Sequence, residues 1–224
     1  MSDAQELDTE ASFTLGRPAL VCRWRLAGRA LPMENRHLRA LSRRELGDGR
    51  VSRELVAWAK QHIEWTLGDG AADYPDGVLM LLVDEEGRAA MTVGPYEPLR
   101  GRSVRALLER AATAHEDGER TGVAPEALWL ARDGRLVWGI ERGTSPSGAS
   151  SLVEGLAQTL GIPVERRAGL IDSVGAGEVD FDEAFLVSDE HGVVPALDAA
   201  GEEGRRFAGA YATLLAKAAK GRRG

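Results

Sequence analysis

The sequence predicts an α+β or mixed α/β fold arranged in two lobes. Helical and strand-like segments follow one another in mixed order along the 224 residues, and several neighbouring strand-like segments are spaced as hairpins. Glycine and proline interrupt the chain between residues 94 and 101, which favours a boundary there. We expect a loose acidic tail over residues 1–16, a small lobe over 17–97, a linker over 98–102 and a larger lobe over 103–224.

The small lobe is expected to contain strands and two helices. Residues 19–26 have strand character and end at Gly28, which favours a turn. Residues 34–46 and 52–67 are predicted helices, and Ser52 is a suitable N-cap for the second. Residues 77–83 and 88–93 are predicted to pair as a hairpin about a turn at 84–87.

The larger lobe begins with a predicted helix over 103–116 and a hairpin over 126–140. Asp133 and Gly134 stand between the two apolar runs of that hairpin, and Asp-Gly is a strong signal for a tight turn. The expected elements that follow are a helix at 150–160, a short strand at 163–167, a helical turn at 169–175, apolar segments at 182–187 and 193–196 around a polar turn, and a helix at 205–219.

Composition and charge exclude several classes of protein. The formal charge is −7 and hydrophobic residues make up 43% of the chain, so we expect no attraction to nucleic acid or to an anionic membrane. The acidic start does not have the pattern of a signal peptide, and the apolar run at 78–83 is too short to span a bilayer. Cys22 is the one cysteine, which predicts neither a disulfide within the chain nor a structural zinc site. These features favour a cytoplasmic protein.

The residue types alone indicate no active site. The sequence has no phosphate loop, dinucleotide fingerprint, nucleophile elbow or zinc-binding His-Glu-x-x-His helix, and we expect no metal site. The four histidines are scattered singly. Cys22 stands beside Arg23, which could lower the pKa of its thiol, but a buried core position is the stronger expectation.

The order of segments carries a family resemblance. Residues 181–201 read FDEAFLVSDEHGVVPALDAAG, which resembles a stretch near the end of the class IV aminotransferases, the fold-type IV pyridoxal-phosphate enzymes. That family includes branched-chain and D-amino-acid aminotransferases and aminodeoxychorismate lyase. The residues in register with its pattern are Asp182, Glu183, Phe185, Pro195 and Gly201. Segments 25–41, 132–137, 148–151 and 158–164 resemble further family stretches in the family's order, so the likeness covers most of residues 19–219.

The resemblance implies a two-lobe fold like that of D-amino-acid aminotransferase. It also implies pyridoxal phosphate as cofactor and a homodimer whose clefts lie near the subunit interface. The alternation around Trp24, or the helix predicted over 34–46, is expected to contribute to that interface. A small molecule would then bind in the cleft between the lobes.

The position of the family's Schiff-base lysine holds a different residue here. The corresponding region, residues 98–105, contains no lysine, and Arg102 or Ser103 stands at the lysine's place. An arginine stays protonated and cannot form the imine. The chain has three lysines, at positions 60, 217 and 220. We therefore expect no catalytic residue at this position, and no covalent bond to the cofactor.

The phosphate-binding positions implied by the resemblance also differ. Ala40 stands where the family has an arginine in His-x-x-Arg-Leu, and Arg39 beside it lies about 100° round the helix. Asp189 stands in the turn where the family offers a threonine to phosphate. Trp138 takes the place of the glutamate that pairs with the pyridine nitrogen, if the Asp-Gly hairpin is matched to the earlier of the family's two hairpins. The remaining candidates for cofactor binding or for the cleft are Arg39, Ser150, Ser151 and Ser188.

Three readings of the function follow. The leading one is a non-catalytic or repurposed relative of the class IV aminotransferases, a pseudoenzyme that binds a ligand or partner. The first alternative is a working pyridoxal-phosphate transaminase or lyase that uses Lys60 as its lysine. The second alternative is a dimeric interaction module whose cleft is filled by side chains.

Overall fold

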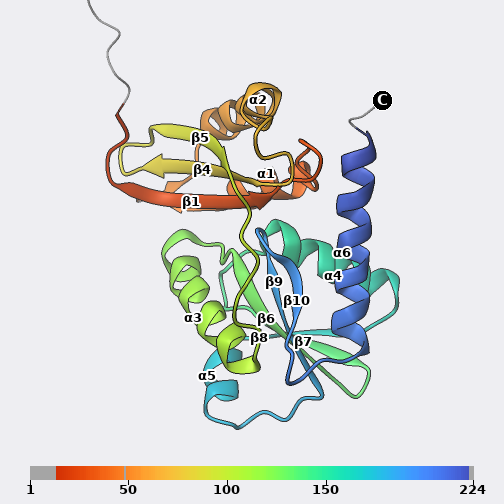
Figure 1. Cartoon of the computed structure of the whole chain (residues 1–224). Helices are drawn as coiled ribbons and strands as arrows, with labels where there is room; N and C mark the ends of the chain where they lie inside the picture. Colours follow the sequence, from red (N-terminus) through yellow and green to blue (C-terminus); the bar gives the residue numbers. More distant parts are fainter. Residues whose placement is uncertain (1–13, 48, 222–224) are drawn as a thin grey trace, which may run out of the picture.

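The computed structural model describes residues 14–47 and 49–221 (Figure 1). The two larger sheets lie one above the other, each with its own helices, and residues 95–101 connect them. Of the expected acidic tail, residues 1–13 lie outside the described residues. Gly16 belongs to the described part, where its N–H donates to Asp84 Oδ2 at 2.9 Å. The structure thus has the mixed α and β composition that the sequence predicts.

The first sheet is three-stranded and antiparallel, in the order β1 (Pro18–Arg25), β4 (Val78–Asp84), β5 (Ala89–Gly94). The helices α1 (Glu34–Leu41) and α2 (Arg53–Asp69) pack with it around a shared core. Side chains alternate across a strand, so the apolar residues of β1 and β4 that face this core come two apart. They are Leu20, Cys22, Trp24, Leu79, Leu81 and Val83, all buried. β1 is an edge strand.

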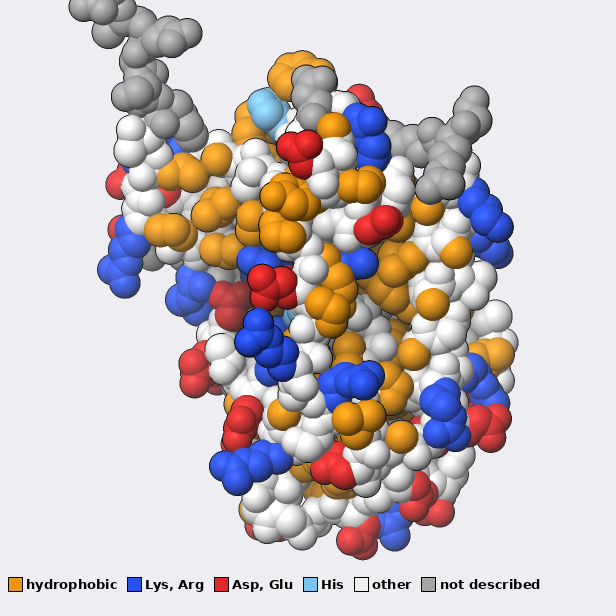
Figure 2. All heavy atoms as spheres, viewed as in Figure 1, with side chains coloured by type: hydrophobic (Ala, Val, Ile, Leu, Met, Phe, Trp, Pro, Cys, Tyr) orange, Lys and Arg blue, Asp and Glu red, His pale blue; other side chains and the backbone are white. Residues whose placement is uncertain are grey.

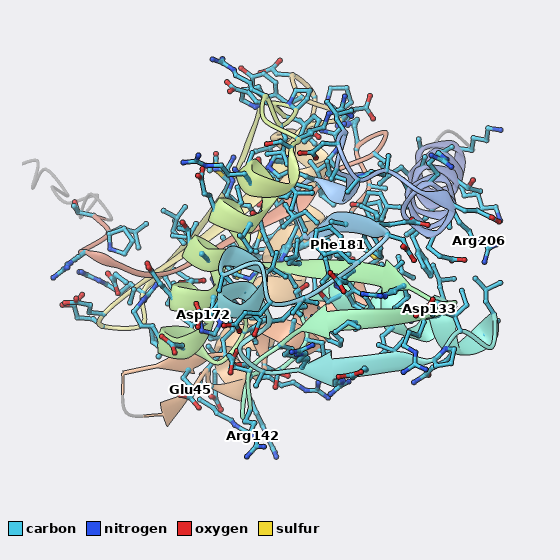
Figure 3. The ribbon with its side chains drawn as sticks, turned by 90° about the horizontal axis from the view of Figure 1, so that it is seen from below. Glu45, Asp133, Arg142, Asp172, Phe181 and Arg206 are labelled. Carbon is cyan, nitrogen blue, oxygen red and sulfur yellow. The ribbon has the colours of Figure 1, made fainter. Side chains whose placement is uncertain are left out.

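The second sheet is five-stranded, in the order β10, β9, β6, β7, β8. Its strands are β6 (Glu126–Arg132), β7 (Arg135–Gly139), β8 (Val164–Arg167), β9 (Glu183–Ser188) and β10 (Gly192–Pro195). β7 and β8 run parallel and the other neighbours are antiparallel. Figure 3 shows Asp133, in the β6–β7 turn, at the opposite end of this sheet from Arg142, which follows β7.

Helices cover both faces of the second sheet. α4 (Gly148–Thr159) and α6 (Glu202–Gly221) pack over Trp129, Trp138 and Phe185 on one face. α3 (Val104–Thr121) and the short α5 (Leu170–Gly175) pack over Leu128 and Leu186 on the other. Every residue of β6 from Glu126 to Ala131 is consequently buried, which explains the continuous apolar run at 127–131. None of the described helices is both long and apolar enough to cross a membrane.

Several boundaries differ from those predicted. α1 ends at Leu41 instead of continuing to residue 46, and a small hairpin of β2 (Glu45–Leu46) and β3 (Gly49–Arg50) follows it. The hydroxyl of Ser42 donates to the carbonyl of Arg39 at the helix end, and Gly47 has a φ of 59°, which favours a tight turn. α3 runs five residues beyond the predicted end, until Gly122 adopts the left-handed conformation that ends it.

The prediction that the alternation around Trp24 exposes this side chain for a subunit interface is wrong. Its side chain is 2% exposed and its ring stacks on His37 with centroids 5.2 Å apart. The alternation of β1 places Trp24 on the core face, and Arg23 and Arg25 on the other.

Candidate functional site

The three-stranded sheet with α1 and α2 forms the first lobe, and the five-stranded sheet with α3 to α6 forms the second. The two lobes meet where α1, the start of α4 and the β9–β10 turn converge. α4 begins at Gly148, and its N-cap Ser147 accepts the N–H of Ser150 at 3.2 Å. Arg36 of α1 donates to the carbonyl of Ser151 at 2.9 Å and to its hydroxyl at 3.1 Å. The amino terminus of α4 therefore points into the junction between the lobes.

Asp189 of the β9–β10 turn closes this helix terminus. It is 4% exposed, and its Oδ1 accepts the N–H of Ala149 at 2.7 Å. Its own main chain is held on two sides, since its carbonyl accepts from Arg25 of β1 at 3.1 Å and its N–H donates to Pro125 at 3.1 Å. Free N–H groups and the helix dipole make a helix amino terminus a natural site for an anion. Here the anion is the protein's own carboxylate.

His37 of α1 lies against the same carboxylate. Its Nδ1 is 3.6 Å from Asp189 Oδ2, and the ring is 1% exposed. A Cβ on Gly148 would lie 2.5 Å from His37 Nδ1, so only glycine permits this close approach of α1 to α4. The histidine, the glycine and the carboxylate fill the space at the helix terminus together.

Nearby groups set the charge of Asp189. Burial would raise its pKa, but the neighbouring His37 ring, the hydrogen bond from the N–H of Ala149 and the charge of Arg44 together hold the pKa of Asp189 below its ordinary value. The carboxyl group is therefore ionised at neutral pH. Burial raises the pKa of the Cys22 thiol to about 11, so this cysteine stays protonated and is a weak nucleophile.

A small cavity lies beside α4. Its volume is about 20 Å³ and Trp138, Ser147 and Ser150 are among its lining residues. Ser150 Oγ and Trp138 Nε1 are buried and have no hydrogen-bond partner among the described residues. The Trp138 ring stacks on Trp129, with centroids 4.8 Å apart and planes 11° from parallel. Space of this size holds about one water molecule.

A larger hollow, which we call the interlobe groove, lies between β1 and α3. Its volume is about 510 Å³. Arg23 donates to Glu190 at 2.8 Å, and Arg110 donates to Glu126 at 2.9 and 2.7 Å. These four side chains belong to its lining, and Figure 2 shows side chains of both charges along the junction of the lobes. An adjoining hollow of about 790 Å³ follows the connecting residues 95–101.

Solved structures of one group of enzymes are similar to this fold. An aminotransferase from Brucella abortus bound to the cofactor PLP has a TM-score of 0.55 and 16% identity, over 91% of this chain and 94% of that one. A fold IV transaminase from Curtobacterium pusillum has a TM-score of 0.54 and 15% identity, over 94% and 90%. The chain has the fold of the class IV aminotransferases.

A lyase structure shares the class IV aminotransferase fold with this chain. A protein described as a 4-amino-4-deoxychorismate lyase from Legionella pneumophila has a TM-score of 0.56 and 12% identity, over 93% of this chain and 96% of that one. No protein-family model matches the sequence, and no curated protein matches it. The likeness is therefore one of fold.

Two sequence-predicted residues lie at the surface of this class IV fold. Ser103 is exposed and caps α3, where its side chain accepts the N–H of Ala106 at 3.2 Å. Arg102 is exposed next to it, and its carbonyl accepts from Leu197 at 2.7 Å. Both lie at the start of α3, and neither lines the cavity beside α4.

The cleft candidates divide into two groups. Ser150 and Ser151 lie at the start of α4, and Ser188 lies at the start of the turn that carries Asp189. Ser188 is fully buried, donates to Glu126 at 2.9 Å, and accepts the N–H groups of the two residues after Asp189. Arg39 is exposed on α1, apart from this group.

Sequence reasoning missed the residues that define the site. The sequence places a carboxylate at position 189 of the turn but indicates no partner for it. It also indicates no contact for His37, which stands in the segment compared with His-x-x-Arg-Leu. Arg36, not Arg39, is the α1 arginine that reaches α4. The signal available was Gly148 beside two serines, which marks a close approach at a helix start, but the sequence does not say which residue approaches. Among the residues placed in the structure, no three His, Cys, Asp or Glu side chains gather to hold a metal ion.

Proposed function

We propose that this chain is a non-catalytic relative of the class IV aminotransferases that works by binding a partner in the interlobe groove. The observation that carries this proposal is the Asp189 carboxylate bound to the N–H of Ala149 at the start of α4. In the resemblance, that helix start and that turn offer their groups to the cofactor's phosphate. An ionised carboxylate there repels a phosphate dianion and already uses the helix N–H group that would bind it.

The residues do not fit pyridoxal phosphate. When bound, this cofactor supplies an aldehyde that a lysine captures and a ring that withdraws electrons from the substrate. The cavity beside α4 is about 20 Å³, whereas cofactor sites measure on the order of 300–1,000 Å³. If the Asp-Gly hairpin is matched to the earlier of the family's two hairpins, Trp138 stands where the resemblance places an acidic partner for the ring nitrogen, and it is stacked on Trp129 and offers an N–H donor.

The positions of the lysines support the same reading. Lys60 is exposed on α2, and Lys217 and Lys220 are exposed on α6. A lysine that captures an aldehyde is activated by burial in an apolar pocket or by a neighbouring cation, and none of these three lysines lines the cavity beside α4. The position of Lys60 therefore argues against the alternative of a working transaminase that uses this lysine. The interlobe groove, at about 510 Å³, has the size of a binding site and favours a binding protein over a module whose cleft is wholly filled.

Reductive labelling tests this proposal. The purified protein is incubated with pyridoxal phosphate, its absorbance between the near ultraviolet and the visible is recorded, and borohydride is added before peptide mass mapping. We expect no aldimine absorbance and no lysine labelled to stoichiometry. Lys60→Ala is the matched control, because random surface labelling is spread over all three lysines. Stoichiometric labelling of Lys60 that Lys60→Ala abolishes would overturn the proposal and establish the transaminase alternative.

A further inference from the structure

β1 presents an open strand edge to the second lobe. It is the outer strand of the three-stranded sheet and pairs with β4 alone among the described strands. In Figure 1 its free edge faces α3 and the β9–β10 turn. The edge of a strand carries main-chain N–H and C=O groups that another strand can pair with.

The hydrogen bonds at the two ends of β1 show which residues turn their main chain outward. Arg25 donates its N–H to Asp189 of the second lobe, while the next residue, Leu26, donates to Gly77 of its own lobe. Main-chain groups alternate between the two sides along an antiparallel pair. Arg25, Arg23 and Val21 stand opposite Val78, Met80 and Leu82 in register, so the main-chain groups of Arg23 and Val21 point outward with those of Arg25.

Residues of the second lobe already form hydrogen bonds with main-chain groups at both ends of this edge. At one end the main-chain carbonyl of Asp189 accepts from Arg25, as the carbonyl of an added strand would. At the other end the guanidinium of Arg120 on α3 donates to the carbonyl of Ala19. Between these contacts lie Val21 and Arg23, and both line the interlobe groove. Val21 is 40% exposed.

The charged side chains of the groove are paired, and small residues lie between them. Arg23 is paired with Glu190, Arg110 with Glu126 and Arg120 with Asp117, and the fourth carboxylate of the lining, Glu109, is paired with Arg105 of α3. Between its charged residues the α3 wall presents Ala106, Thr113 and Ala114. Paired charges give no net attraction for a charged ligand, and small wall residues leave room for the side chains of an occupant. The occupant that matches a strand edge, small walls and neutral charge is an uncharged extended chain.

We propose that the edge of β1 binds an extended, uncharged peptide segment of a partner protein, which adds to the sheet as a strand beside Val21 and Arg23. This inference rests on the proposed binding function and names its occupant. Main-chain hydrogen bonds to the two outward-facing residues supply the affinity, and the small residues of the α3 wall leave room for the peptide's side chains. The Ala19 carbonyl and the Arg25 N–H are already bonded to the second lobe, so the open stretch of the edge is residues 20–24, which spans about 17 Å and accommodates about five residues of peptide.

Val21→Pro is the variant that tests the proposal. Proline removes the outward N–H of residue 21 but leaves the pairing of its neighbours with β4, and edge strands tolerate proline where the N–H faces away from the sheet. Val21→Thr is the matched control, because threonine keeps the N–H and the branched shape. Circular dichroism and thermal unfolding of both variants establish that they are folded.

The probe is a phage-displayed library of random heptapeptides, selected against the full chain. We expect enriched peptides that are uncharged and rich in β-branched residues. A fluorescent copy of an enriched peptide should bind Val21→Pro about tenfold more weakly than wild type, the effect of one lost hydrogen bond, and bind Val21→Thr within about twofold. On wild type, the peptide should shift the amide NMR signals of Val21 and Arg23, a readout that does not depend on the proline variant folding.

The inference is overturned if no peptide is enriched, if the enriched peptides are charged, if Val21→Pro binds as tightly as Val21→Thr, or if the shifted amides lie outside β1. These results are separate from the borohydride test. A chain that forms no aldimine and enriches no peptide leaves the proposed non-catalytic role standing and removes the peptide as its occupant. A chain that labels Lys60 to stoichiometry removes the proposed function itself.

Discussion

His37 Nδ1 and Asp189 Oδ2 lie 3.6 Å apart in the interior. The two residues are 152 positions apart in the sequence, and the contact of α1 with the β9–β10 turn brings them together. The carboxylate also accepts a hydrogen bond from the first turn of α4. One side chain thus joins the two lobes and satisfies a helix terminus. The buried Asp189 carboxylate is therefore part of the structure that holds the two lobes together.

Removal of the Asp189 carboxylate should destabilise the protein and leave a site for a small anion. Asp189→Ala leaves the N–H of Ala149 buried without its acceptor, at a cost of about 1–3 kcal/mol. We expect about 100 mM formate to raise the melting temperature of Asp189→Ala, because formate restores a carboxylate to the vacated position. Thermal unfolding in formate and in chloride of equal ionic strength measures the effect.

Asp189→Asn is the matched control for this rescue. Its amide fills the same space, so formate should change its melting temperature no more than that of the wild type. Equal formate effects on all three proteins would contradict an anion site at the start of α4.

Stability should fall in acid through Asp84. Burial would raise the pKa of this carboxyl group, but the N–H of Gly16 and the bonds from Arg88 outweigh it and lower the pKa to about 2. The folded-state pKa lies below the unfolded value, about 3.9, so the stabilisation is complete above about pH 5 and is lost as the pH falls through 4 towards 2. Urea unfolding between pH 6 and 2 measures this slope. Asp84→Asn should be less stable at pH 6 and show a shallower slope, and an unchanged slope in that variant would contradict the assignment.

Two glycines of α4 should respond oppositely to alanine. In Gly148→Ala the new Cβ meets His37 Nδ1 at 2.5 Å, so the ring or the helix must move, and we expect a loss of about 1–3 kcal/mol. In Gly155→Ala the nearest of the neighbouring atoms is 3.6 Å away, and we expect a gain of up to about 1 kcal/mol from helix propensity. Chemical denaturation of the two variants decides the matter, and a Gly148→Ala protein as stable as Gly155→Ala would show that α1 and α4 are not in tight contact.

The Cys22 thiol should be unreactive in the native protein. It is 3% exposed, and burial raises its pKa to about 11, so little thiolate is present at pH 8. Ellman's reagent should release one equivalent of colour per chain in denaturing urea and almost none without it. Rapid stoichiometric reaction of the native protein would show that the core around β1 opens readily.

The homodimer implied by the family resemblance stays a prediction. Light scattering coupled to size-exclusion chromatography should give twice the chain mass of 24.0 kDa at micromolar concentration. A mass of one chain would contradict it. Since Trp24 is buried against His37, a Trp24 substitution is expected to unfold the first lobe rather than to dissociate a dimer.

The local pattern of the sequence determined the elements of this fold. Asp133-Gly134 predicted the β6–β7 hairpin because few residues tolerate the left-handed conformation that both adopt in this turn, with φ of 50° and 71°. Apolar residues two apart predicted β1, and Ser52 predicted the start of α2, where its side chain accepts the N–H of Leu55. The order of segments indicated the class IV aminotransferase fold. The boundaries at 98–102 between the lobes stay a prediction.

Tertiary structure alone decided the site. The contact of His37 with Asp189 depends on how two lobes pack, and no local spacing encodes it. The end of α1 at Leu41 and the burial of Trp24 depend on which face of each element meets a neighbour. The sequence could state that a lysine is missing and that a carboxylate stands in a turn. Only the folded chain brings that carboxylate onto a helix terminus, because electrostatic and hydrogen-bond energies depend on distances that arise between segments far apart in the chain.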